Sequence, residues 1–246
     1  MDRLLYVAMT GAKQLLQAQT LVAHNLANVA TNGFRADLAR FTAQPIEGPG
    51  YASRVNTVAS GIGFDHSQGT LQETGRPLDL AIDGAGYIAV QTADGAEAYT
   101  RGGTLNVGPL GLLETQRGEV VLGDNGPIAV PPHTQISIGA DGTIAIVPQG
   151  QGPETLAQVG RIKLVNPEPA TVEKRPDGLI RLADGALAEP DAGVTVVAGF
   201  IEASNVSMAG SMIDMIEIAR QFEVAVRMMR AADENAERAA SLVRMS

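Results

Sequence analysis

The chain changes character within the stretch Ala23-His24-Asn25-Leu26-Ala27-Asn28-Val29-Ala30-Thr31-Asn32-Gly33-Phe34-Arg35. Before it, apolar residues recur at alternating steps of four and three, which is the heptad pattern of a packed helix. We therefore expect a helix over residues 1–30, with Leu15, Val22 and Leu26 on its apolar seam. Asn25, Asn28, Thr31 and the turn pair Asn32-Gly33 are suited to stop this helix and redirect the chain.

The same repeat returns near the C-terminus, where it runs from Met208 to Val243 and is interrupted by Asp233. Asn205 and Ser207 precede it and are candidates to cap the free N–H groups of a helix. We expect a helix within residues 204–246. Its seam includes Met212, Met215, Phe222, Val226 and Met229. Asp233 either fixes the register through a polar partner, such as an arginine of another copy, or lies in solvent beyond the packed region.

Short runs of alternating or β-branched residues fill the middle of the chain and predict strands. These runs are Leu78–Ile82, Tyr87–Val90, Glu119–Leu122, Gln135–Ile138, Thr143–Val147, Gln158–Val165, Leu179–Leu182 and Val194–Ala198. Asp-Gly pairs between them favour tight turns, so an antiparallel β domain is expected over residues 78–203. Residues 31–77 show neither period for long and predict an extended, partly irregular connector. The fold class is α+β.

Composition limits the function. The 246 residues carry a net charge of −9, and the 18 basic residues are scattered, which argues against nucleic-acid binding. Cysteine is absent, so thiol chemistry and Cys-ligated zinc are excluded. No apolar run is long enough for a membrane span or for the core of a signal peptide.

The sequence predicts no catalytic, cofactor or metal site. Gly84-Ala85-Gly86-Tyr87-Ile88-Ala89 matches a dinucleotide fingerprint, but the helix that must follow is missing. The three histidines, at positions 24, 66 and 133, are far apart and lack a partner pattern for metal binding or a catalytic triad.

The helices are long for the domain between them. At about 1.5 Å per residue they span roughly 42 and 55 Å, whereas a β domain of roughly 120 residues has a radius of gyration of only ~14 Å. The seams cannot be buried on that domain alone, so self-association is expected. An intramolecular helical hairpin is the alternative.

The stretch from Asn25 to Arg35 resembles the signature of bacterial flagellar rod and hook proteins, Asn-Leu-Ala-Asn followed by Thr-x-Gly-Phe and a basic residue. Arg35 stands where lysine is common and keeps the charge. Three further segments resemble the same family. They are Gly69–Gly84, Tyr99–Gly103, and Ser204–Val206 together with Arg220–Glu223. The two chain ends are more similar to the proximal-rod member of the family than to the distal-rod member.

The resemblance implies a structural, non-enzymatic subunit without a cofactor. Its terminal helices would pack with those of other copies and of adjacent rod proteins as a coiled-coil tube, with the β domain outside. It also implies export by the flagellar type III apparatus and a place in the basal-body rod that crosses the periplasm. On this view the assembly interface includes Leu15, Val22, Asn25, Leu26, Asn28, Thr31, Gly33, Phe34, Asn205, Met212, Met215, Arg220, Phe222, Val226, Met229 and Asp233. Phe34 either anchors into a neighbour or fills the core of its own domain.

Other functions remain open at this point. The chain is alternatively a distal-rod protein of the same family, or a periplasmic glycan-binding β module. The chain has no Trp and only four Tyr, and this shortage of the aromatic residues that usually stack on sugars argues against glycan binding. A glycan-cleaving enzyme needs paired carboxylates in a cleft, and the sequence offers no convincing pair.

Overall fold

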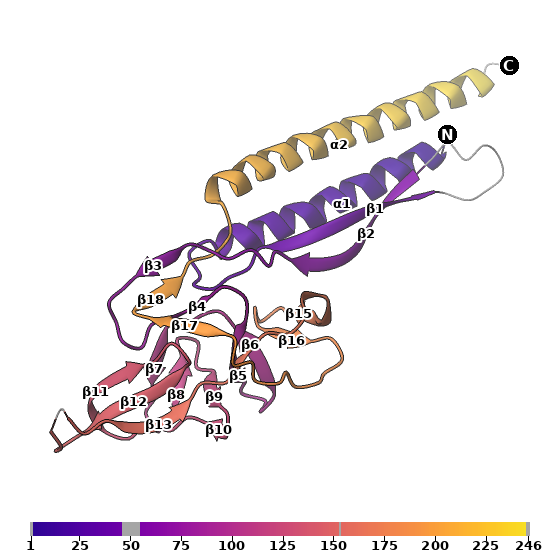
Figure 1. The fold of residues 1–246 in the computed structure, drawn as a ribbon. Coiled ribbons are helices and arrows are strands. Elements are labelled where there is room, and N and C mark those ends of the chain that lie inside the picture. Colours follow the sequence, from indigo (N-terminus) through magenta and orange to yellow (C-terminus); the bar gives the residue numbers. More distant parts are fainter. Residues whose placement is uncertain (1, 46–54, 153, 245–246) are drawn as a thin grey trace. The chain divides into compact units, whose positions relative to one another are not determined.

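The computed structural model describes residues 2–45, 55–152 and 154–244. It has a helix near each end of the chain, α1 (Asp2–Ala27) and α2 (Met208–Arg244), with strands between them (Figure 1). The expected α+β class is therefore confirmed. Met1 and residues 245–246, which the sequence assigned to the helices, lie outside the described residues. Neither helix combines the length and the apolar character that crossing a membrane requires.

The chain divides into two compact units. The helical unit contains residues 2–27, 37–45, 55–64 and 206–244. The β unit contains residues 28–36 and the described part of 65–205. The segment between α1 and the first strand thus belongs to the β unit, although it is short and lies far from the rest of that unit in sequence.

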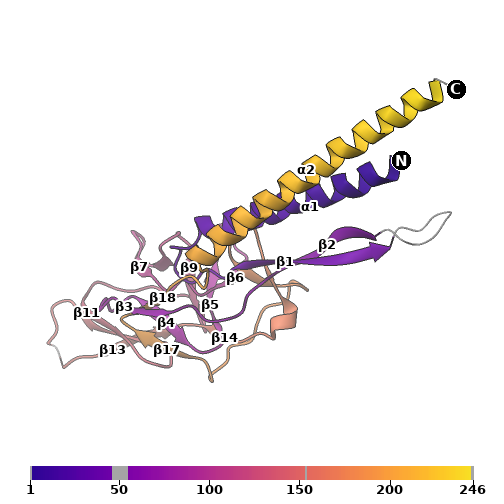
Figure 2. The ribbon, with the colours of Figure 1, turned by 90° about the horizontal axis from the view of Figure 1, so that it is seen from above.

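In the helical unit, α1 and α2 pack side by side (Figures 1 and 2). Strands β1 (Asp37–Pro45) and β2 (Val55–Phe64) form an antiparallel hairpin that contacts α1, with a register shift between Ala39 and Phe41. This hairpin occupies much of the stretch expected as a partly irregular connector. Most side chains of β1 are exposed, so the alternation of apolar and polar residues that reveals a half-buried strand is missing. The Pro-Gly cluster that follows Pro45 lies outside the described residues.

The β unit contains two sheets and two two-stranded ribbons, and the strand pairs among its described residues are antiparallel. The largest sheet runs in the order β15 (Val172–Lys174), β16 (Ile180–Leu182), β6 (Glu97–Thr100), β5 (Tyr87–Gln91), β9 (Val120–Gly123), β8 (Leu113–Thr115) and β7 (Leu105–Val107), with β10 (Gly126–Pro127) on β9 and β14 (Leu164–Val165) on β5. A second sheet contains β11 (His133–Ile138), β12 (Thr143–Pro148) and β13 (Ala157–Arg161). Two ribbons pair β4 (Leu80–Asp83) with β17 (Thr195–Ala198), and β3 (Leu71–Glu73) with β18 (Phe200–Glu202).

One apolar core joins these strands. Leu80, Ile88, Val90, Leu105 and Ile144 are completely buried in it. All eight expected runs contain strands, but the run 158–165 is divided between β13 and β14. The turn at each of the five Asp-Gly pairs is confirmed by a positive φ at its glycine. The three-residue strands β7 and β15 are too short to produce a visible alternation and were not predicted.

Candidate functional site

The end of α1 is tied to the beginning of β1 within the helical unit. The side chain of Asn25 donates from Nδ2 to the Asp37 carbonyl oxygen at 2.9 Å and accepts from the Asp37 N–H at Oδ1 at 2.8 Å. His24 Nδ1 lies 2.7 Å from Asp37 Oδ2. Asn25 is buried, so it stops the helix by holding a returning strand rather than by capping free carbonyl groups.

The segment that follows α1 forms a tight turn in the β unit. The Thr31 N–H donates to the Asn28 carbonyl oxygen at 3.1 Å, and its hydroxyl contacts Asn28 Oδ1 at 3.2 Å. Gly33 has a φ of 70°, and its N–H donates to the Glu202 carbonyl oxygen at 2.7 Å. A Cβ on Gly33 would lie 2.3 Å from the Arg101 carbonyl carbon, so only glycine fits this position.

Phe34 is buried in the β unit of its own chain. Lys174, from β15, lies over its ring with Nζ 3.6 Å from the ring centroid, and the same Nζ donates to the Arg35 carbonyl oxygen at 2.7 Å. A cation over an aromatic face is attractive, and more so away from water. Of the two alternatives for Phe34, the one in which it fills its own domain matches this position.

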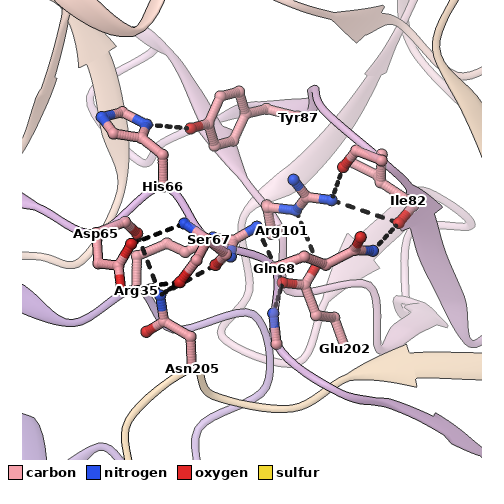
Figure 3. A network of polar contacts seen from close by, with 12 residues as sticks. Arg35, Asp65, His66, Ser67, Gln68, Ile82, Tyr87, Arg101, Glu202 and Asn205 are labelled. Carbon is pink, nitrogen blue, oxygen red and sulfur yellow. Dashed lines mark hydrogen bonds and ion pairs between the residues drawn. The ribbon is translucent and has the colours of Figure 1, made fainter.

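A cluster of three buried charges lies beside this segment (Figure 3). Glu202 is 1% exposed, Arg35 2% and Arg101 5%. Glu202 Oε1 is 2.9 Å from Arg35 Nη2, and Glu202 Oε2 is 2.8 Å from Arg101 Nε. Arg101 also donates from Nη2 to the carbonyl oxygens of Gly84 at 2.6 Å and Ile82 at 3.3 Å. We call this group the Arg35–Glu202–Arg101 cluster.

The electrostatics around the cluster follow from burial and from its positive charge. Burial lowers the pKa of His66, and the positive charge of Arg35 lowers it further, while Asp65 opposes both effects. Burial also raises the pKa of Tyr87, whose hydroxyl lies 3.5 Å from His66 Nδ1. Burial and the charge of Arg35 thus both favour the neutral form of His66.

Asn205 joins the segments around the cluster (Figure 3). Its Oδ1 accepts from the Ala36 N–H at 2.7 Å, and its Nδ2 contacts the carbonyl oxygens of Asp65 at 3.2 Å and Ser67 at 3.0 Å. The helix cap is instead Ser207, whose hydroxyl accepts from the Gly210 N–H at 3.2 Å.

Most of the predicted seam positions of both helices are half-buried in the helical unit. Leu15, Val22 and Leu26 on α1 have intermediate exposure, and so do the four α2 residues Met215, Phe222, Val226 and Met229. Met212, Arg220 and Asp233 are exposed. Because α1 and α2 pack together, the predicted seam positions lie where an intramolecular contact can cover them in part.

Each helix also has a second apolar stripe, which the heptad analysis did not identify. Ile213, Ile216, Val224 and Met228 on α2 are all at least half exposed. At 100° per residue these four positions fall on the side of the helix opposite Met215, Phe222, Val226 and Met229. Tyr6, Met9 and Leu16 are exposed apolar residues on α1, and they lie about 100° or more around the helix from Leu15 and Val22. We call these seven residues the outer stripes. Steps of three and four from residue 213 would have revealed the α2 stripe.

The pocket beside the signature segment offers no pair of catalytic acids. It has a volume of about 240 Å³ and is lined by residues that include Asn32, Phe34, Thr104, Arg117 and Glu119. Glu119 is the carboxylate among its described lining residues, and it bonds to the Thr115 hydroxyl. Within the described part of the chain, no three His, Cys, Asp or Glu side chains are grouped to hold a metal ion.

Family models match three parts of the chain. Residues 5–35 match "Flagella basal body rod protein", residues 81–146 match "Flagellar hook protein FlgE/F/G D1 domain", and residues 197–242 match "Flagellar basal body rod FlgEFG protein C-terminal". The flagellar basal-body rod protein FlgF of Salmonella typhimurium is 44% identical over the full length of both chains. This chain belongs to the flagellar basal-body rod proteins.

Two further relatives show which member of this family the chain resembles more. The FlgF protein of Escherichia coli is 43% identical over the full length of both chains. The FlgG protein of Bacillus subtilis is 33% identical, over 95% of this rod protein and 96% of its own length. The similarity to FlgF confirms the preference that the chain ends indicated. The family consists of structural rod proteins rather than enzymes, which confirms the predicted class.

Proposed function

We propose that this rod protein is a subunit of the proximal rod, and that it joins other copies and neighbouring rod proteins through α1 and α2. Its place is the flagellar basal-body rod, as for its FlgF relatives. The observation that carries the mode of joining is the pair of outer stripes. Large apolar side chains on two opposite sides of a helix favour cover on both sides. On α2 the charged residues Glu217, Arg220 and Arg227 lie among the outer-stripe residues, so the cover would combine apolar and ion-pair contacts.

The exposure of large apolar side chains on α2 supports this role. Ile213 is 64% exposed and Ile216 is 60% exposed, and they lie one turn apart on α2. Contiguous apolar surface on a soluble protein marks a site of interaction. Neighbouring helices that bury the outer stripes would form the coiled-coil wall of a tube, with the seams as intramolecular contacts and the stripes as contacts between subunits.

Charge supports the same division of roles. In the sequence, the helical unit has nine acidic and nine basic residues, whereas the β unit has 18 acidic and nine basic residues. The whole net charge of −9 thus belongs to the β unit. Helical units with no net charge approach one another without net repulsion, while the acidic β units of adjacent copies repel. Tight packing is therefore favoured through the helices.

The signature residues were expected in the assembly interface, and this proposal gives them a different role. Asn25, Asn28, Thr31, Gly33, Phe34 and Asn205 make contacts within their own units, so we assign them to shaping the subunit. Assembly contacts are assigned to the outer stripes, with Met212, Arg220 and Asp233 beside them. We further propose that the subunit reaches the rod by the flagellar type III export apparatus.

Complementation tests the proposal. Cells that lack this rod protein are expected not to swim and to lack a complete rod in isolated basal bodies. Expression of the chain should restore both, and an antibody to the chain should label the rod in the isolated particles. Normal swimming and intact rods in the deletion strain would contradict the proposed role.

A further inference from the structure

We propose that the Arg35–Glu202–Arg101 cluster is a latch that couples residues 32–36 to residues 202–205 inside the β unit. The first segment follows α1 in the chain and the second precedes α2. When the latch is closed, both segments are held, and when it opens both are released. The segment that follows α1 and the segment that precedes α2 are therefore either both held by the β unit or both released from it.

Glu202 is the centre of the latch because it bonds to three other segments. Its carboxylate pairs with Arg35 and Arg101, its Oε1 accepts from the Gly69 N–H at 2.9 Å, and its carbonyl oxygen accepts from the Gly33 N–H. Positions 33, 69, 101 and 202 lie far apart in sequence. A single side chain thus joins four segments, and its displacement affects all of them.

Backbone contacts continue the coupling on both sides of Glu202. The Asn205 N–H donates to the Phe34 carbonyl oxygen at 3.2 Å, and the Ala203 N–H donates to the Thr70 carbonyl oxygen at 2.9 Å. The approach at Gly69 is as close as that at Gly33, since a Cβ there would lie 2.0 Å from the Ala203 carbonyl oxygen. A larger residue at Gly33 or Gly69 would therefore push apart the segments that meet there.

The charges explain why the segments should separate as a group. Two guanidinium groups face one carboxylate, and Nε and Nη1 of Arg35 have no hydrogen-bond acceptor among the residues that the structure describes. Loss of one partner from a buried ion pair leaves the other charge buried and unpaired, which is strongly unfavourable. Departure of Glu202 would leave both guanidinium groups buried and unpaired, which favours their hydration, so the segments that Glu202 joins separate together.

Amide hydrogen exchange on the full chain tests the coupling. The variant Arg35→Met leaves one arginine opposite one carboxylate, so the β unit retains a balanced pair. We expect the amides of Ala203 and Asn205, on the opposite segment, to exchange at least about tenfold faster, while those of Val90 and Ile144 in the core keep their rates. Coupling is reciprocal, so Asn205→Ala should accelerate the amide of Gly33.

The matched control is Asp94→Asn, which removes a charge from the same unit at an exposed carboxylate 3.9 Å from Arg181. It should leave all of these amides unchanged. The latch is refuted if Arg35→Met accelerates Gly33 but not Asn205, or if it accelerates Val90 by the same factor as Asn205. Should Arg35→Met fail to fold, Arg35→Lys keeps the charge but loses the planar fork, and the same comparison of amides decides. None of these measurements requires assembly, so a negative result leaves the proposed function untouched.

Discussion

Single residues in the β unit are constrained by close packing, and Gly33 shows this most clearly. Gly33→Ala should lower the free energy of unfolding by about 2–4 kcal/mol, because it combines a left-handed conformation with a collision against the Arg101 backbone. Gly95→Ala is the control, since Gly95 has a φ of 82° and open space around its Cβ direction. That substitution should cost only about 1 kcal/mol. Urea unfolding measures both, and equal losses would contradict the steric explanation.

Because the hydroxyl of Tyr99 is buried, we expect the protein to lose stability at high pH. Its burial raises the pKa of the hydroxyl from 10.0 to about 12, with Glu97 adding to the increase and the Ala188 N–H opposing it. Because the folded pKa lies above the unfolded one, the contribution to stability is complete below pH 10 and is lost as the pH rises toward 12. Urea midpoints of the wild type should therefore fall across this range. In Tyr99→Phe, which cannot ionise at this position, the fall should be smaller, and an identical fall would refute the assignment.

At the scale of the element, the ends of α2 and the signature turn show what the sequence predicts well. The helix starts after Ser207, one of the two cap candidates, and most of the seam positions that heptad spacing predicts are half-buried, because both features depend on local chemistry that is visible in a few residues. The hairpin of β1 and β2 was not predicted because its exposed strands show no alternation. The Arg35–Glu202–Arg101 cluster was not predicted either, since nothing in the sequence relates residue 35 to residue 202.

The cap of α2 supports an element-scale prediction. Ser207→Ala should lower stability of the helical unit by about 1 kcal/mol and accelerate exchange of the Gly210 amide, because Gly210 loses its acceptor. Ser211→Ala, one turn into the helix, is the control and should be nearly neutral. Hydrogen exchange and thermal unfolding distinguish them. Similar effects of the two substitutions would show that Ser207 does not act as a cap.

At the scale of the whole molecule, the short segment 28–36 belongs to the β unit and is expected to be needed for its stability. A chain that begins at residue 28 keeps Gly33, Phe34 and Arg35, whereas a chain that begins at residue 37 leaves Glu202 without one arginine. The first truncation should retain the urea midpoint of the β unit, and the second should lower it. The same midpoint for both truncations would show that the segment contributes nothing.

The central claim is that subunits join through the outer stripes of the helices. The most direct test replaces Ile213 and Ile216 with Asp in cells that have no other copy of this rod protein, followed by isolation of basal bodies. The control replaces Leu110 and Leu156, two exposed leucines of the β unit, in the same way. We expect the helix variant to fold as a monomer and be absent from the basal bodies, and the control variant to be present at wild-type amounts. Incorporation of the helix variant at the wild-type level would contradict the account.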